Sequence, residues 1–129
     1  MCDSEFAELV EAIRALDADV ISLEAARSAM DVAEAFARSG YDTELGLGIW
    51  DIHSPRVPAT AEMLELLRRA LSVLDADRVW VNPDCGLKTR SWDEVMPALA
   101  NMVQAARVAR EELRLSRHSA SATRDVTTP

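Results

Sequence analysis

The amino-acid sequence predicts an α/β fold, because short strand-like runs alternate with segments of helical periodicity. Three short apolar runs predict strands at residues 20–23, 45–50 and 79–81, and the first of them is β-branched. The strands are expected to be apolar on both faces, which together with the alternation is typical of a parallel sheet with right-handed crossovers. With 129 residues, the chain is long enough for one domain at most.

The first two helices are expected on either side of the first strand. Apolar side chains three and four residues apart predict a helix over residues 6–16, with Asp3 or Ser4 as its N-cap. The second helix is expected to begin at Ser28 as N-cap. It is expected to end at Gly40, because glycine favours the left-handed conformation that terminates helices.

Two further helices and a tail complete the predicted order. Thr60 is expected to cap the third helix, and Ser91 with Glu94 has the spacing of a capping box for the last one. Pro97 predicts an irregular or kinked start to that last helix. Residues 116–129 show no periodicity and are expected to form a disordered tail.

Composition and charge exclude several classes of protein. The net charge of -8, from 22 acidic and 14 basic residues, argues against nucleic acid or an anionic membrane as a partner. No apolar run approaches the roughly 20 residues of a membrane helix. The N-terminus is acidic and lacks the features of a secretory signal, so we expect a cytoplasmic protein. In that reducing compartment Cys2 and Cys85 are expected to be free thiols or metal ligands.

Chemically versatile side chains follow the predicted strands at the point where each strand ends. Glu24 follows the first strand, His53 the second, and Asp84 and Cys85 the third, while Cys2 precedes the first helix, where an earlier strand would end. Because the carboxyl ends of parallel strands meet at one edge of the sheet, we expect these side chains to converge.

The pattern indicates a zinc site without excluding a simpler reading. Two thiolates and one carboxylate, from Cys2, Cys85 and Glu24, would give Zn²⁺ three ligands and leave one position open for a thiol substrate. The alternative is that both cysteines are inert, because free cysteine is often a buried core residue.

Four segments of the chain carry a resemblance to a known family. Residues 51–58 (DIHSPRVP) and 80–90 (WVNPDCGLKTR), with the opening MCDSEF and residues 17–28, resemble signature segments of cobalamin-independent methionine synthase. That enzyme is the 5-methyltetrahydropteroyltriglutamate-homocysteine methyltransferase. The resemblance extends from Cys2 to about Leu113. It implies that residues 1–115 form the C-terminal segment of a catalytic (β/α)8 TIM barrel, with the last three of its eight strands.

The resemblance also implies a set of site residues. Cys2, Glu24 and Cys85 resemble three of the family's four zinc ligands, and His53 resembles its proton donor. The family's substrates are homocysteine and 5-methyltetrahydropteroyltriglutamate. Asp51 or Asp84 could orient His53 or a ligand, and a purely structural role in the loops is the alternative.

The fourth ligand in the family is a histidine two positions before the cysteine, a position that precedes Met1 here. We therefore expect a fragment that is inactive alone. The alternatives are a non-catalytic module that completes a barrel supplied by a separate chain, and a small zinc-binding fragment.

Overall fold

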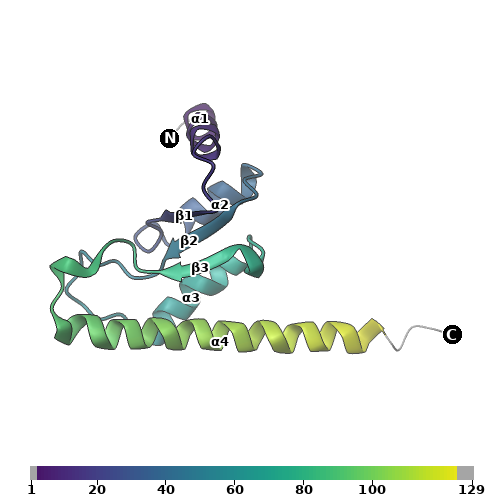
Figure 1. Ribbon diagram of the computed structural model, residues 1–129. Coiled ribbons are helices and arrows are strands. Elements are labelled where there is room, and N and C mark those ends of the chain that lie inside the picture. The colour runs from purple at the N-terminus through teal and green to yellow at the C-terminus, as the bar shows by residue number, and fades with distance from the viewer. Residues whose placement is uncertain (1–2, 125–129) are drawn as a thin grey trace.

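The computed structural model describes residues 3–124, with side chains described from residue 6 to residue 120. Helices and strands alternate in an α/β arrangement, as the sequence predicts (Figure 1). Two short 3-10 turns lie at Ala76–Arg78 and Leu87–Thr89. The main elements in chain order are α1 (Asp3–Arg14), β1 (Val20–Leu23), α2 (Asp31–Arg38), β2 (Glu44–Gly48), α3 (Thr60–Leu71), β3 (Val79–Asn82) and α4 (Trp92–Arg124).

The three strands form one parallel sheet in the order β1-β2-β3. The register places Leu23 of β1 opposite Leu47 of β2, and Leu47 opposite Val81 of β3. The predicted parallel sheet is therefore confirmed. Because the strands run the same way, their carboxyl ends and the loops that follow lie at one edge of the sheet.

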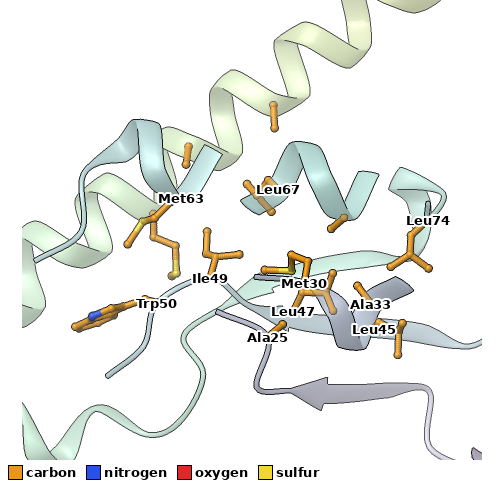
Figure 2. Packing of buried hydrophobic residues seen from close by; sticks show 14 of the residues in the cluster. Ala25, Met30, Ala33, Leu45, Leu47, Ile49, Trp50, Met63, Leu67 and Leu74 are labelled. Carbon is orange, nitrogen blue, oxygen red and sulfur yellow. The ribbon is translucent and has the colours of Figure 1, made fainter. Parts of the chain in front are cut away.

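The hydrophobic core lies on the face of the sheet that the helices cover. Leu45, Leu47 and Ile49, at alternate positions of β2 and its extension, are at most 2% exposed. Figure 2 shows Leu47 and Ile49 on the side of the sheet where Met63 and Leu67 project from α3. Packing against α3 thus fixes which face of β2 is buried.

Helix α1 is attached to the core through aromatic contacts. The ring of Phe36 on α2 makes edge-to-face contacts with Phe6 of α1 and with Tyr41, at centroid distances of 5.4 and 5.2 Å. In Figure 1 α1 lies at one side of the molecule and α4 at the other.

The opposite face of the sheet is uncovered within the described part of the chain. Val20, Ser22 and Trp80 point to this face, and Trp80 is 58% exposed. The indole Nε1 of Trp80 donates a hydrogen bond to the carboxylate of Glu44. The expectation that the strands are apolar on both faces is wrong for this side, where serine, glycine and asparagine alternate with the apolar residues.

The start of α2 differs from the prediction. The helix begins at Asp31, because Ala29 and Met30 have positive φ angles of 47° and 74° and close a tight turn first. Ser28 lies inside that turn, where its hydroxyl donates to the carbonyl of Ala25 instead of capping the helix. The end is as predicted: α2 stops at Arg38, and Gly40 has a φ of 70°.

The N-terminus of α3 also differs in detail. Ala59, not Thr60, is the N-cap, and its N–H donates to the carboxylate of Glu62 at 2.8 Å. The capping interaction at the start of α4 agrees with the prediction, since the N–H of Ser91 donates to Glu94 at 2.9 Å.

Helix α4 is longer and more regular than the sequence indicates. It continues through Pro97, at the cost of one backbone hydrogen bond. It also includes residues 116–124, which were expected to be disordered. The hydroxyls of Ser116 and Ser119 donate hydrogen bonds to backbone carbonyls three and four residues earlier, so both hydroxyls have partners within the helix. Residues 125–129 lie outside the described part. None of the described helices combines the length and hydropathy that crossing a bilayer requires.

Candidate metal centre

Three loops at the carboxyl edge of the sheet bring Glu24, His53 and Cys85 together. Glu24 directly follows β1, His53 lies in the loop after β2, and Cys85 lies in the loop after β3. One potential ligand atom from each residue lies within 4.8 Å of the other two. Residues 29 and 32 positions apart in sequence thus form one cluster, because parallel strands align the loops that carry them.

The Cys85 thiol and the Glu24 carboxylate are in direct contact. Sγ of Cys85 donates to Oε1 of Glu24 at a distance of 2.6 Å. This hydrogen bond, together with desolvation and the negative charge of Glu24, raises the pKa of the Cys85 thiol. The contact with Glu24 thus favours the protonated thiol of Cys85 over the thiolate.

His53 lies on an exposed turn shaped by Asp51. Oδ1 of Asp51 accepts a hydrogen bond from the backbone N–H of His53 at 3.0 Å. Its other oxygen lies 3.8 Å from Nε of Arg27. Of the two aspartates considered from the sequence, Asp51 thus orients the backbone that carries the histidine.

Asp84 is buried directly beside the cluster. Its Oδ1 accepts hydrogen bonds from the N–H groups of Ala25 and Ala26, at 3.0 and 3.2 Å. Burial raises the pKa of the Asp84 carboxyl, against the lowering effect of these two hydrogen bonds. Asp84 lies in the loop that carries Cys85, and its side chain contacts the loop that carries Glu24.

Sequence reasoning did not identify Gly48, which makes room for Asp84. A Cβ atom at position 48 would lie 1.9 Å from Oδ1 of Asp84. The available signal was a glycine inside a strand, which often marks a close approach of another chain segment.

A cavity of about 290 Å³ lies next to the loops after β1 and β2. Its lining includes Arg27 and Arg56, which suggests an anion site at first sight. However, Arg56 binds both carboxylate oxygens of Glu62, at 2.8 and 2.6 Å. The positive charge of Arg56 is thus already compensated, and the metal cluster remains the better candidate site.

Cys2, the remaining predicted ligand, lies outside the described residues. The described cluster offers one sulfur, one imidazole nitrogen and one carboxylate oxygen as potential ligand atoms, with His53, predicted as the proton donor, supplying the nitrogen. These are the three donor types that Zn²⁺ takes in proteins.

The chain matches one protein family along most of its length. The profile described as "Cobalamin-independent synthase, Catalytic domain" matches residues 1–108. The chain belongs to the cobalamin-independent methionine synthase family. Proteins named 5-methyltetrahydropteroyltriglutamate–homocysteine methyltransferase are similar to it. That of Halalkalibacterium halodurans is 60% identical over 114 residues, and that of Acidithiobacillus ferrooxidans is 56% identical over 110 residues.

These family members are much longer than the chain. The matches cover 88% and 85% of the chain but only 15% and 14% of the two relatives. A solved structure of a B12-independent methionine synthase from a Shewanella species, in complex with selenomethionine, has a TM-score of 0.73. The sequence identity between the two proteins is 24%, and the match covers 85% of this chain and 30% of the Shewanella chain. The chain therefore has the fold of part of a methionine synthase.

Proposed function

We propose that the chain is the C-terminal segment of a catalytic (β/α)8 barrel that transfers the methyl group of 5-methyltetrahydropteroyltriglutamate to homocysteine. In this proposal Cys2, Glu24 and Cys85 are zinc ligands and His53 is the proton donor. The observation that carries it is the cluster of Glu24, His53 and Cys85 at the carboxyl edge of the sheet, where β/α barrels hold their active sites. Membership in the cobalamin-independent methionine synthase family supports this choice of reaction.

The described side chains fit a zinc ion with a small adjustment. Thiolate sulfur and carboxylate oxygen are both ligand types that Zn²⁺ takes, so Cys85 and Glu24 would hold the ion. The observed separation of 2.6 Å between Cys85 and Glu24 is that of a hydrogen bond. Binding of a zinc ion by Cys85 and Glu24 would require the thiol to lose its proton and this hydrogen bond to open.

The methyl transfer needs an activated homocysteine thiol and a proton for the folate nitrogen, and the residues of the cluster suit both needs. When bound, zinc would lower the pKa of the homocysteine thiol and so favour the thiolate as nucleophile. Loss of the methyl group leaves a folate nitrogen that requires a proton. The exposed imidazole of His53 lies beside Glu24 and Cys85 and is placed to act as the general acid that supplies it.

We further infer that the chain alone does not complete the reaction. Its sheet has three strands in the described part, with one face uncovered, whereas a closed barrel has eight. A reducing cytoplasm suits the proposed function, because Cys85 must stay a thiol to bind zinc.

A chimeric enzyme tests this function. Residues 1–108, which match the family profile, replace the corresponding segment of the full-length Halalkalibacterium halodurans relative, and methionine formation is measured with zinc and both substrates. We expect an active chimera, and His53→Gln lowers kcat by about 10²–10⁴-fold. Asp42→Asn, at an exposed position outside the cluster, is the control. A folded, zinc-loaded chimera without activity contradicts the proposed function, and methionine formation by the isolated chain contradicts its inactivity.

The uncovered face of the sheet supports a second candidate, a non-catalytic module that completes a barrel supplied by a separate chain. Val20 and Trp80 expose apolar surface there. Co-elution with a polypeptide that holds the preceding barrel strands, without methyl transfer, would favour this role. A zinc-binding fragment is the third candidate, and equal zinc content in wild type and Cys85→Ser would exclude it.

A further inference from the structure

We propose that Asp84 is the positioning residue of the candidate metal centre. It connects the three loops that carry Glu24, His53 and Cys85, and thereby sets the spacing of the ligand atoms. This inference rests on the metal site of the proposed function, but the contacts that carry it are all between protein atoms.

The side chain of Asp84 holds the loop after β1. Its Oδ1 accepts hydrogen bonds from two successive N–H groups, those of Ala25 and Ala26. Ala25 is the residue after Glu24 and is fully buried, so this loop cannot turn away without breaking both bonds. Because Asp84 is only 8% exposed, water competes little for these hydrogen bonds.

The backbone of Asp84 holds the loop after β2. Its N–H donates to the carbonyl of Trp50 at 3.0 Å, next to the bond from the N–H of Ile49 to the carbonyl of Asn82 at 2.9 Å. These two bonds extend the pairing of β2 and β3 beyond the strand ends. Trp50 immediately precedes Asp51, which bonds to the N–H of His53. Asp84 thus contacts the loops of Glu24 and His53, and Cys85 is the next residue.

The path of the Asp84 side chain explains why a glycine ends β2. The carboxylate comes from the loop after β3 and reaches the loop after β1, so it must cross the central strand. At Gly48 a Cβ would lie 1.9 Å from Oδ1 of Asp84 and 2.7 Å from its Cα. Only glycine leaves space for this crossing.

The burial of Asp84 is not explained by stability alone. Its Oδ2 is buried and has no hydrogen-bond partner among the described residues. An unpaired buried oxygen on a carboxylate costs folding free energy. The presence of a buried aspartate at position 84 is therefore better explained by the two hydrogen bonds through which Oδ1 holds the loop after β1.

Two substitutions separate positioning from general stability. Asp84→Asn keeps an oxygen that can accept both N–H groups, whereas Asp84→Ala removes it. Asp42→Asn is the matched control, because it removes a charge at an exposed position. The full chain and a Cys2→Ser variant are titrated with Co²⁺, and the thiolate charge-transfer absorption that remains in Cys2→Ser reports the Cys85 bond. Hydrogen exchange of the Ala25 and Ala26 amides is measured by NMR without metal.

We expect Asp84→Ala to weaken Co²⁺ binding by about 10–100-fold and to expose both amides to exchange. Asp84→Asn is expected to keep the amide protection and a Co²⁺ affinity within a few-fold of wild type. The proposal is overturned if Asp84→Ala keeps both properties, or if Asp84→Asn loses them. If Asp84→Ala does not fold, the amide protection and Co²⁺ affinity of Asp84→Asn still test the proposal, because their loss would overturn it. Failure of the wild-type chain to bind Co²⁺ would contradict the zinc site of the proposed function, while amide exchange tests the loop connection separately.

Discussion

At the residue scale, the contact between Cys85 and Glu24 predicts an unusual pH dependence. The carboxylate accepts a hydrogen bond from the thiol and repels the thiolate, and both effects raise the pKa of Cys85. Glu24→Gln removes the charge and supplies an amide that can donate to the thiolate. We therefore expect Glu24→Gln to lower the pKa of Cys85 and to speed its alkylation at a fixed pH below that pKa.

The measurement is the rate of iodoacetamide labelling at Cys85 against pH, with the modified peptide resolved from that of Cys2 by mass spectrometry. Asp42→Asn serves as a control for the loss of one negative charge elsewhere. An unchanged pH midpoint in Glu24→Gln would show that the carboxylate does not determine the thiol titration.

The sequence could predict which residues lie together at the edge of the sheet, but it could not predict the contacts that hold their loops in place. Glu24, His53 and Cys85 each follow a recognisable strand, so the parallel topology alone places them at one edge. The role of Asp84 depends on two backbone N–H groups about sixty residues away, and no local pattern encodes such contacts. Cys2 stays a prediction, because its placement lies outside the described residues.

At the scale of elements, β2 differs from its neighbours in having glycine at two of the three positions that point to the uncovered face. A Cβ at Gly46 would meet side-chain oxygens of Asn82 and Ser22 at 2.6 and 2.9 Å. These side chains can rotate away. At Gly48 the obstruction includes the Asp84 backbone, which cannot.

We therefore expect Gly48→Ala to destabilise the chain more than Gly46→Ala does. An overpacked site costs about 1–3 kcal/mol, and we expect Gly48→Ala in that range because its neighbour is fixed. Urea unfolding of the two variants measures the difference in unfolding free energy. Equal losses would mean that Asp84 moves as freely as Asn82, against the tight crossing inferred for its carboxylate.

The helix ends show where local signals were insufficient. Gly40 and the pair Ser91 and Glu94 act as predicted, because their effects depend only on adjacent backbone. Ser28 had the right residue type for a cap, but its hydroxyl bonds to Ala25, in the turn that Asp84 fixes. Tertiary contacts thus override the local preference at this position.

At the scale of the whole molecule, the sheet has one covered and one uncovered face. The sequence predicted the parallel sheet, because strands and helices alternate and each strand is short and apolar. It could not predict which side of each strand stays open, because that depends on what packs against the sheet. Strands β1 and β3 each pair with a single neighbour among the described strands, so both edges present unpaired backbone groups.

This open surface predicts self-association of the isolated chain. Trp80 is 58% exposed on the uncovered face, and burying such surface against a second copy is favourable. We expect the sedimentation coefficient to rise with concentration, and Trp80→Lys to weaken that rise, because a charge on this face opposes its burial. Leu115→Lys is the matched control, since Leu115 is 53% exposed on α4, away from the sheet. Association that survives Trp80→Lys but is lost in Leu115→Lys would place the contact on α4 instead.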